Sequence, residues 1–167
     1  MGDPVSLRPA RPEDTDFLQS VYASTRADEM ALVDWTDEQK AAFCRMQYHA
    51  QATHYSTYYP QAETSILLRG ETPIGRLIVD RSGDALLLMD IALLPEHRGY
   101  GIGTALIRDL MAEARAAGKP VRLHVETFNP AQRLYQRLGF REVGITGVHI
   151  EMVYRPDAIA EEDTPHA

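Results

Sequence analysis

A short glycine-rich stretch, residues 90–104, carries the residue types best suited to bind a phosphate. It reads Asp-Ile-Ala-Leu-Leu-Pro-Glu-His-Arg-Gly-Tyr-Gly-Ile-Gly-Thr, so that Arg98 is followed by Gly99, Gly101 and Gly103. Alternating glycines leave the backbone uncovered, and successive N–H groups can then converge on an anion. The residues after the glycines have helical periodicity, and the positive end of that helix would add to the attraction. The stretch therefore predicts a phosphate site between a strand and a helix.

Two common phosphate-binding patterns fit this stretch poorly. A Walker loop requires a lysine after its last glycine, and no lysine lies between Lys40 and Lys119. The dinucleotide pattern G-x-G-x-x-G fails because Thr104 or Leu106 stands where its third glycine should be. Glu126 nevertheless lies roughly twenty residues further on, where a ribose-binding acid could sit. Dinucleotide binding is therefore kept as a weaker alternative.

Length and composition are those of one globular domain, which we expect to span residues 1–155. The chain has 167 residues, of which 44% are hydrophobic and 25% charged, and no apolar run is long enough for a membrane span. Its formal net charge of −7 argues against nucleic acid as a partner. With a single cysteine, Cys44, and no signal-peptide pattern, we expect a cytoplasmic protein. The acidic segment 156–167 is predicted to be disordered.

The elements that must position the glycine stretch alternate between strands and helices. Periodicity and turn residues predict strands at 5–8, 65–69, 73–81, 85–94, 121–126, 140–143 and 148–154, and helices at 13–25, 36–54, 102–117 and 129–138. The three strands after the second helix form an antiparallel meander. The strand, helix and strand around residues 102–117 imply a parallel pair. We therefore expect an α/β (α+β) fold with a mixed central sheet.

Rings crowd the end of the second predicted helix, between Met46 and Tyr59. This segment contains two histidines and four tyrosines before Pro60. Such amphipathic side chains can line a pocket, form a half-hydrated packing face or make a dimer seam, and the sequence leaves these three interpretations open. No spacing of histidines and acids here suggests a metal site, so we expect no bound metal.

Two motifs resemble those of the GCN5-related N-acetyltransferases, the GNAT family, which use acetyl-CoA. Arg98-x-x-Gly101-x-Gly103 is similar to that family's pyrophosphate-binding pattern [QR]-x-x-G-x-[GA]. The segment Asn-Pro-Ala-Gln-Arg-Leu-Tyr-Gln-Arg-Leu-Gly-Phe, residues 129–140, resembles its N-x-x-A-x-x-[FL]-Y-x-x-x-GF pattern, with the alanine displaced towards Asn129. The order of predicted elements over residues 5–154 also matches. The resemblance implies helices on both faces of the sheet and a parallel pair of strands that splay apart.

The resemblance also assigns roles around the cofactor, acetyl-CoA. The backbone of Ile91, Ala92 and Leu93 would bind the pantetheine arm. Main-chain N–H groups of the loop would hold the pyrophosphate, from the residues Arg98, Gly99, Tyr100, Gly101, Ile102, Gly103 and Thr104. Asn129 would bind the cofactor or cap its own helix, and Tyr135 matches the general acid that reprotonates the departing thiolate.

The general base is assigned less directly. Asp90 is a carboxylate in an apolar strand, where it needs a partner or a shifted pKa, and it is the first candidate. Glu126, at the end of the next strand, is the second, and water is the third. The expected reaction is direct acetyl transfer to a primary amine of a small molecule or peptide. A non-catalytic acyl-CoA-binding module is the alternative, and the sequence leaves monomer and homodimer open.

Overall fold

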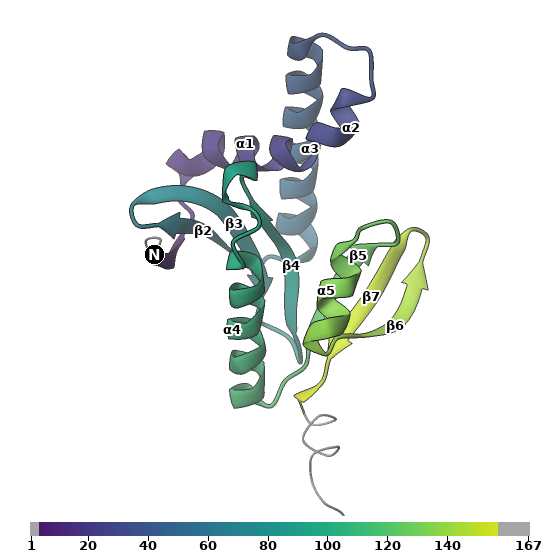
Figure 1. Ribbon diagram of the computed structural model, residues 1–167. Coiled ribbons are helices and arrows are strands. Elements are labelled where there is room, and N and C mark those ends of the chain that lie inside the picture. Colours follow the sequence, from purple (N-terminus) through teal and green to yellow (C-terminus); the bar gives the residue numbers. More distant parts are fainter. Residues whose placement is uncertain (1–3, 157–167) are drawn as a thin grey trace, which may run out of the picture. The chain divides into compact units, whose positions relative to one another are not determined.

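The computed structural model describes residues 4–156, which form seven strands and five α-helices. The elements are β1 (Val5–Pro9), a 3-10 turn (Pro12–Asp14), α1 (Thr15–Thr25), α2 (Ala27–Ala31), α3 (Asp37–Tyr58), β2 (Glu63–Arg69), β3 (Thr72–Asp80), β4 (Leu86–Leu93), a second 3-10 turn (Pro95–His97), α4 (Ile102–Ala117), β5 (Val121–Glu126), α5 (Ala131–Leu138), β6 (Arg141–Thr146) and β7 (His149–Tyr154). The strands follow the order β1-β2-β3-β4-β5-β7-β6 (Figure 1). The expected mixed sheet is confirmed.

The chain divides into two compact units. The first contains residues 4–78 and 90–100, and the second contains residues 79–89 and 101–156. The division passes through β3 and β4, so each of these strands contributes to both units.

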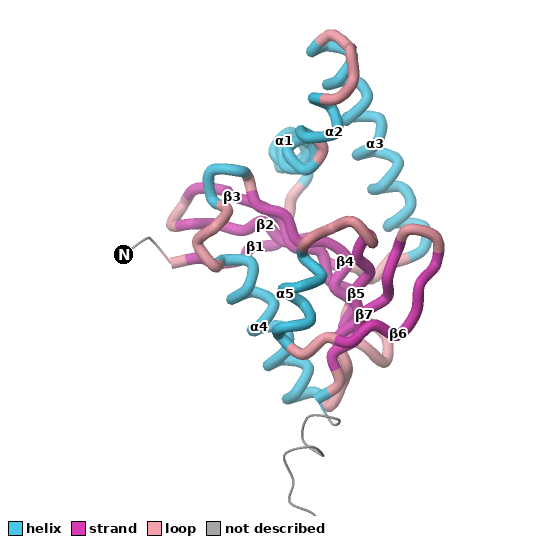
Figure 2. The backbone as a smooth tube through the Cα atoms, turned by 45° about the vertical axis from the view of Figure 1, so that its right-hand side comes forward, coloured by secondary structure: helices cyan, strands magenta, loops and turns pink. Residues whose placement is uncertain are grey.

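The first unit combines an antiparallel meander with α1, α2 and α3. β1 pairs with β2 in antiparallel register from Val5↔Arg69 to Pro9↔Ser65. The helices α1 and α3 run in different directions, and α2 with the following loop lies near the start of α3 (Figures 1 and 2). The Tyr22 ring of α1 meets the Tyr48 ring of α3 edge-on, with their centroids 6.2 Å apart. Burial of apolar side chains from α1, β2 and β3 makes the core of this unit.

The second unit is built around β5. β4 and β5 pair in parallel over three residue pairs, from Leu86↔Val121 to Leu88↔Leu123. β5 then pairs antiparallel with β7, and β7 with β6, where the register shifts between Glu142 and Gly144. Apolar side chains at alternate positions of β5 and β7 are buried, whereas every residue of β6 is exposed.

Most predicted boundaries agree with the structure to within a residue or two, and four details differ. The strand predicted at 140–143 is β6, which continues to Thr146. Residues 27–31 form α2, although the sequence around them has no clean helical period. The second predicted helix continues beyond residue 54 to Tyr58. The helix predicted over 129–138 begins two residues later, because α5 starts at Ala131 with Pro130 as its N-cap. The predicted disordered segment 156–167 lies, apart from its first residue, outside the described residues.

Candidate active site

The connection from β4 to α4 forms the predicted phosphate loop. Gly99 and Gly101 have left-handed backbone conformations, with φ of 84° and 77°. The Ala105 N–H donates to the Gly101 carbonyl at 3.0 Å and begins the helical hydrogen bonding of α4. In the described part of the chain, no backbone carbonyl accepts a hydrogen bond from the N–H groups of residues 99–104. The loop thus offers a run of unused donors at a helix N-terminus, which suits an anion.

The Arg98 side chain braces this loop against the end of β4. Its Nε donates to the Leu93 carbonyl at 2.9 Å, and its Nη2 lies 3.4 Å from the Ser24 hydroxyl of α1. The guanidinium is therefore engaged by protein groups, and the Leu93 carbonyl is already bonded. The Ala92 carbonyl oxygen, also among the groups predicted to meet pantetheine, faces Gly75 of β3.

A second arginine, Arg69, stacks on the ring of Tyr100, which lies between Gly99 and Gly101. The Arg69 guanidinium lies 5.1 Å from the centroid of the Tyr100 ring and 3.4 Å from Nδ1 of His97. Tyr100 itself is 66% exposed. The positive charge of Arg69 is thus held beside the loop by stacking rather than by a carboxylate.

Gly75 allows β3 to approach the end of β4 closely. A Cβ on Gly75 would collide with the Ala92 carbonyl oxygen and touch Leu93. The Leu94 N–H donates to the Ile74 carbonyl at 2.8 Å on the same side. Only glycine permits this approach, so Gly75 sets the position of the segment predicted to meet pantetheine.

Asp90 is held by a buried arginine. The Arg76 Nε donates to Asp90 Oδ2 at 2.5 Å, and the Arg76 Nη2 donates to Gln51 Oε1 of α3 at 2.9 Å. The side chain of Arg76 is 4% exposed and that of Asp90 is 25% exposed. The sequence predicted that this carboxylate needs a partner, and the structure supplies one from β3. A lone arginine within the apolar run 74–79 was the signal that could have revealed it.

Glu126, the second base candidate, has a different setting at the end of β5. It is half-buried, and its carboxylate makes no hydrogen bond or ion pair with any residue in 4–156. Its neighbours on the same face are already engaged: Glu151 accepts from Arg122 at 2.7 Å and lies 3.6 Å from Nε2 of His124. Of the two carboxylates, Glu126 is the one whose two oxygens both lack a partner among residues 4–156.

Tyr135 is oriented by an aromatic chain in the second unit. Its ring meets the buried Phe140 ring edge-on at 5.7 Å, and Phe140 in turn lies 5.9 Å from the Tyr154 ring. The left-handed Gly139 ends α5 and lets the Phe140 N–H donate back to the Tyr135 carbonyl at 2.9 Å. The turn after α5 therefore places Phe140 directly against Tyr135, which is half-buried.

Asn129 lies just before Pro130, the N-cap residue of α5. Its Oδ1 accepts a hydrogen bond from the N–H of Ala131, the first residue of the helix, at 2.9 Å. This hydrogen bond uses only the oxygen of the amide. The amide N–H₂ remains able to donate to a ligand.

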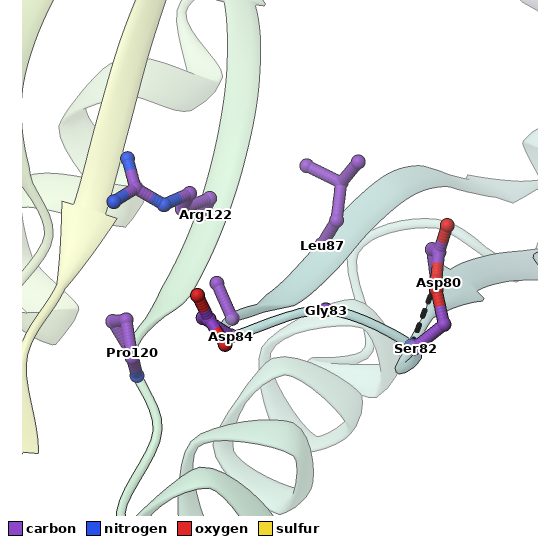
Figure 3. A pocket seen from close by; sticks show the side chains of 8 residues that line it. Asp80, Ser82, Gly83, Asp84, Leu87, Pro120 and Arg122 are labelled. Atoms are coloured by element: carbon purple, nitrogen blue, oxygen red, sulfur yellow. Dashed lines mark hydrogen bonds between the residues drawn. The ribbon is translucent and has the colours of Figure 1, made fainter. Parts of the chain in front are cut away.

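A pocket of about 500 Å³ lies at the other end of β4, where the strand begins. It is lined mainly by the turn between β3 and β4 together with Pro120 and Arg122 (Figure 3). Asp80 points to Ser82 and accepts hydrogen bonds from its N–H at 2.8 Å and its hydroxyl at 2.6 Å. The Arg122 guanidinium is paired with Glu151. Asp80 and Arg122 therefore already have partners within the protein, and we do not assign the predicted phosphate site to this pocket.

The predicted site residues divide between the two units. The first holds Asp90, the segment 91–93 and the loop to Tyr100, while the second holds Gly101 to Thr104, Glu126, Asn129 and Tyr135. Within residues 4–156, no group of three or more His, Cys, Asp or Glu side chains could hold a metal ion.

Comparison with known proteins identifies the family. Residues 60–142 match the family model described as the acetyltransferase (GNAT) domain. The [ribosomal protein bS18]-alanine N-acetyltransferase of Haemophilus influenzae is 34% identical over 80 residues, which are 47% of this chain and 55% of that protein. The alignment thus spans about half of this curated relative. The chain belongs to the GNAT acetyltransferase family.

Solved structures of the same family share the fold. The PaiA N-acetyltransferase of Thermoplasma acidophilum, in complex with coenzyme A, is 19% identical with a TM-score of 0.69, covering 91% of this chain and 99% of its own. An acetyltransferase of Thermus thermophilus is 22% identical with a TM-score of 0.64, covering 93% and 99%. The family match begins after α3 and includes the loop, β5 and α5. This match to an acetyltransferase family does not support the alternative interpretation of the loop as a dinucleotide-binding site.

None of the helices within residues 4–156 combines the length and apolar character needed to cross a membrane.

Proposed function

We propose that this protein is a cytoplasmic N-acetyltransferase that moves an acetyl group from acetyl-CoA directly to a primary amine. One observation carries the cofactor assignment: the N–H groups of residues 99–104 are unused, at the start of α4. A Cβ at Gly99 or Gly101 would meet nothing within 4 Å, so open space lies beside these donors. The residues present therefore fit the pyrophosphate of coenzyme A. When bound, acetyl-CoA supplies an activated thioester whose acyl group an amine can take.

Tyr135 and Glu126 are the groups that we assign to proton transfer. The Tyr135 phenol donates a proton to the leaving sulfur, and its ring is held for that task by Phe140. The Glu126 carboxylate accepts a proton from the amine, because it has no partner of its own in the described chain. Asp90 is less suited to this role, since Arg76 occupies one of its oxygens. The backbone of residues 91–93 is assigned to the pantetheine arm by the family resemblance, and the N–H₂ of the Asn129 amide can donate to the cofactor.

Cofactor binding is tested by thermal shift with coenzyme A. Gly101→Val should abolish the protection, because valine does not tolerate φ of 77° and its side chain fills the space beside the loop donors. Gly83→Val is the matched control, since Gly83 also has open space around it but lies in the β3–β4 turn. Equal protection of the Gly101 variant and the wild type would contradict the assignment.

Catalysis is tested by following free thiol with acetyl-CoA and a panel of amines, amino acids and peptides. We expect thiol release that requires an amine, and a fall in kcat of roughly 10²- to 10⁴-fold in Tyr135→Phe with coenzyme A protection intact. Tyr58→Phe is the control, because that ring is 68% exposed and ends α3. Glu126→Gln should lower kcat more than Asp90→Asn does. Tight binding of coenzyme A with no release from any acceptor would indicate a non-catalytic binding module instead.

A further inference from the structure

A buried polar network in the first unit links α3 to the middle of the sheet. The Arg76 guanidinium lies at its centre, bonded to Asp90 on β4 and to Gln51 on α3. Its Cζ also lies 5.8 Å from the centroid of the Tyr22 ring. The N–H groups of the Arg76 guanidinium thus hold Oδ2 of Asp90 and, through Gln51, the helix α3 at the same time.

Stability alone does not account for this network. Replacing a buried ion pair by apolar side chains is often neutral or stabilising, because both charges lose their hydration on burial. Here the burial is unequal, since the side chain of Arg76 is 4% exposed whereas that of Asp90 is 25% exposed. The guanidinium is thus hidden behind a carboxylate that water can reach. Asp90 Oδ2 is taken by Arg76, and Oδ1 has no hydrogen-bond partner among residues 4–156.

Two tyrosines of α3 lie near the Arg76–Asp90 ion pair. Burial raises the pKa of the Tyr55 phenol, and the charge of Asp90 raises it further. Burial also raises the pKa of Tyr48, which lies close enough to Arg76 for that cation to oppose the shift. Both phenols therefore stay uncharged at neutral pH, Tyr55 near Asp90 and Tyr48 near Arg76. Neutral aromatic faces together with a carboxylate are suited to an organic ammonium ion.

We propose that Arg76 is a positioning residue for the acceptor amine: it fixes Asp90 so that Oδ1 receives the ammonium group of the incoming substrate. This inference rests on the proposed acetyltransferase function and narrows the acceptor to an amine that arrives charged. Gln51 has the secondary role of aligning α3, and with it Tyr55 and Tyr48, on that oxygen. The rings near the end of α3 thereby divide into an inner pair at the network and outer rings such as Tyr58.

A direct test uses the Nε–H signal of Arg76 in ¹⁵N-labelled protein, assigned through its loss in Arg76→Lys. Butylammonium chloride and benzylammonium chloride are titrated in separately, with butan-1-ol and sodium chloride as uncharged and ionic controls. We expect an ammonium ion to shift the Arg76 signal, because it draws on the carboxylate that this N–H bonds. The signal of Arg8, which pairs with Asp14 elsewhere in the same unit, should stay unchanged.

The titration has clear opposing outcomes. Asp90→Asn should remove the response to ammonium while the protein remains folded. Equal shifts with butan-1-ol, or no shift with either ammonium ion, would overturn the inference. This readout needs no turnover, so it decides the role of Arg76 even if no amine is acetylated and the proposed function fails.

Kinetics with an amine that is acetylated supply the second readout. Arg76→Lys keeps the positive charge but loses the planar set of N–H donors of the guanidinium. We therefore expect KM for the amine to rise about tenfold to a hundredfold, with KM for acetyl-CoA unchanged. Gln51→Leu should raise the same KM less. Arg8→Lys, in the Arg8–Asp14 pair, should change neither constant. An Arg76→Lys variant with wild-type KM for the amine would refute the positioning role.

Discussion

Replacing Asp90 by leucine should destabilise the first unit more than replacing Arg76 by methionine, although both changes break the same ion pair. Asp90→Leu leaves a guanidinium that is 4% exposed with Gln51 as its remaining hydrogen-bond partner. Removing one member of a buried pair costs about 3–5 kcal/mol. Arg76→Met leaves a carboxylate that is 25% exposed and can regain water, so its cost should be about 1–3 kcal/mol. The order of the two costs follows from the unequal burial.

The double variant separates this explanation from a simple loss of contacts. With both charges gone, neither desolvation penalty remains, and we expect the double variant to unfold within about 1 kcal/mol of the wild type. For a chain of this size, each kcal/mol shifts Tm by about 2–4 °C. Asp90→Leu alone should therefore lower Tm by about 6–20 °C, most of which Arg76→Met restores.

Urea unfolding followed by tryptophan fluorescence is the appropriate assay. The chain has one tryptophan, Trp35, which belongs to the first unit and packs edge-on against Phe43 at 5.3 Å. Its signal therefore reports the unit that contains the ion pair. A double variant as unstable as the sum of the single variants would refute the reasoning, as would a larger loss from Arg76→Met than from Asp90→Leu.

Three further predictions concern the frame of the site. Gly75→Ala should lower Tm and weaken coenzyme A protection, because its Cβ would collide with the Ala92 carbonyl; thermal shift checks both effects. The hydrogen bond from Arg8, with help from a backbone N–H, holds the pKa of the Asp14 carboxyl at about 2, below its ordinary value of 3.8. Stability from this pair is thus present above pH 3.8 and lost as the pH falls towards 2, and Asp14→Asn should flatten the pH dependence of Tm there. Thr36→Ala removes the N-cap of α3 and should cost about 1 kcal/mol in urea unfolding.

The sequence was sufficient to predict the glycine-rich loop together with α4 and β5, which follow it in the chain. Glycines at 99, 101 and 103 signal a left-handed, uncovered backbone, and the structure has Gly99 and Gly101 in that conformation. α4 and β5 have their predicted bounds because Gly118 ends the helix and alternation marks the strand. Local rules were weaker at residues 27–31, where a short helix forms without a clean period of its own.

Whether the predicted catalytic groups act as assigned stays a prediction, but the structure changes the choice between them. Asp90 and Glu126 look alike in the sequence, as single acids in or after an apolar strand. They differ only through distant residues, since Arg76, itself held by Gln51, engages Asp90, while the Glu126 carboxylate has no partner in the described part of the chain. The ring-rich segment was equally ambiguous, and it divides into inner and outer rings only when α3 is placed against β3 and β4.

The amino-acid sequence by itself determined the family motifs, the order of the elements and the phosphate loop, because these depend on residues close together in the chain. Glycine conformation, helix ends and strand alternation are local properties, and they can be read locally. Tertiary structure alone decided that a buried arginine holds Asp90, that Gln51 of α3 joins the same arginine and that Arg98 reaches Ser24 of α1. The hydrogen bonds of Arg76 join residues 14 and 25 positions apart, and only folding brings such groups within bonding distance.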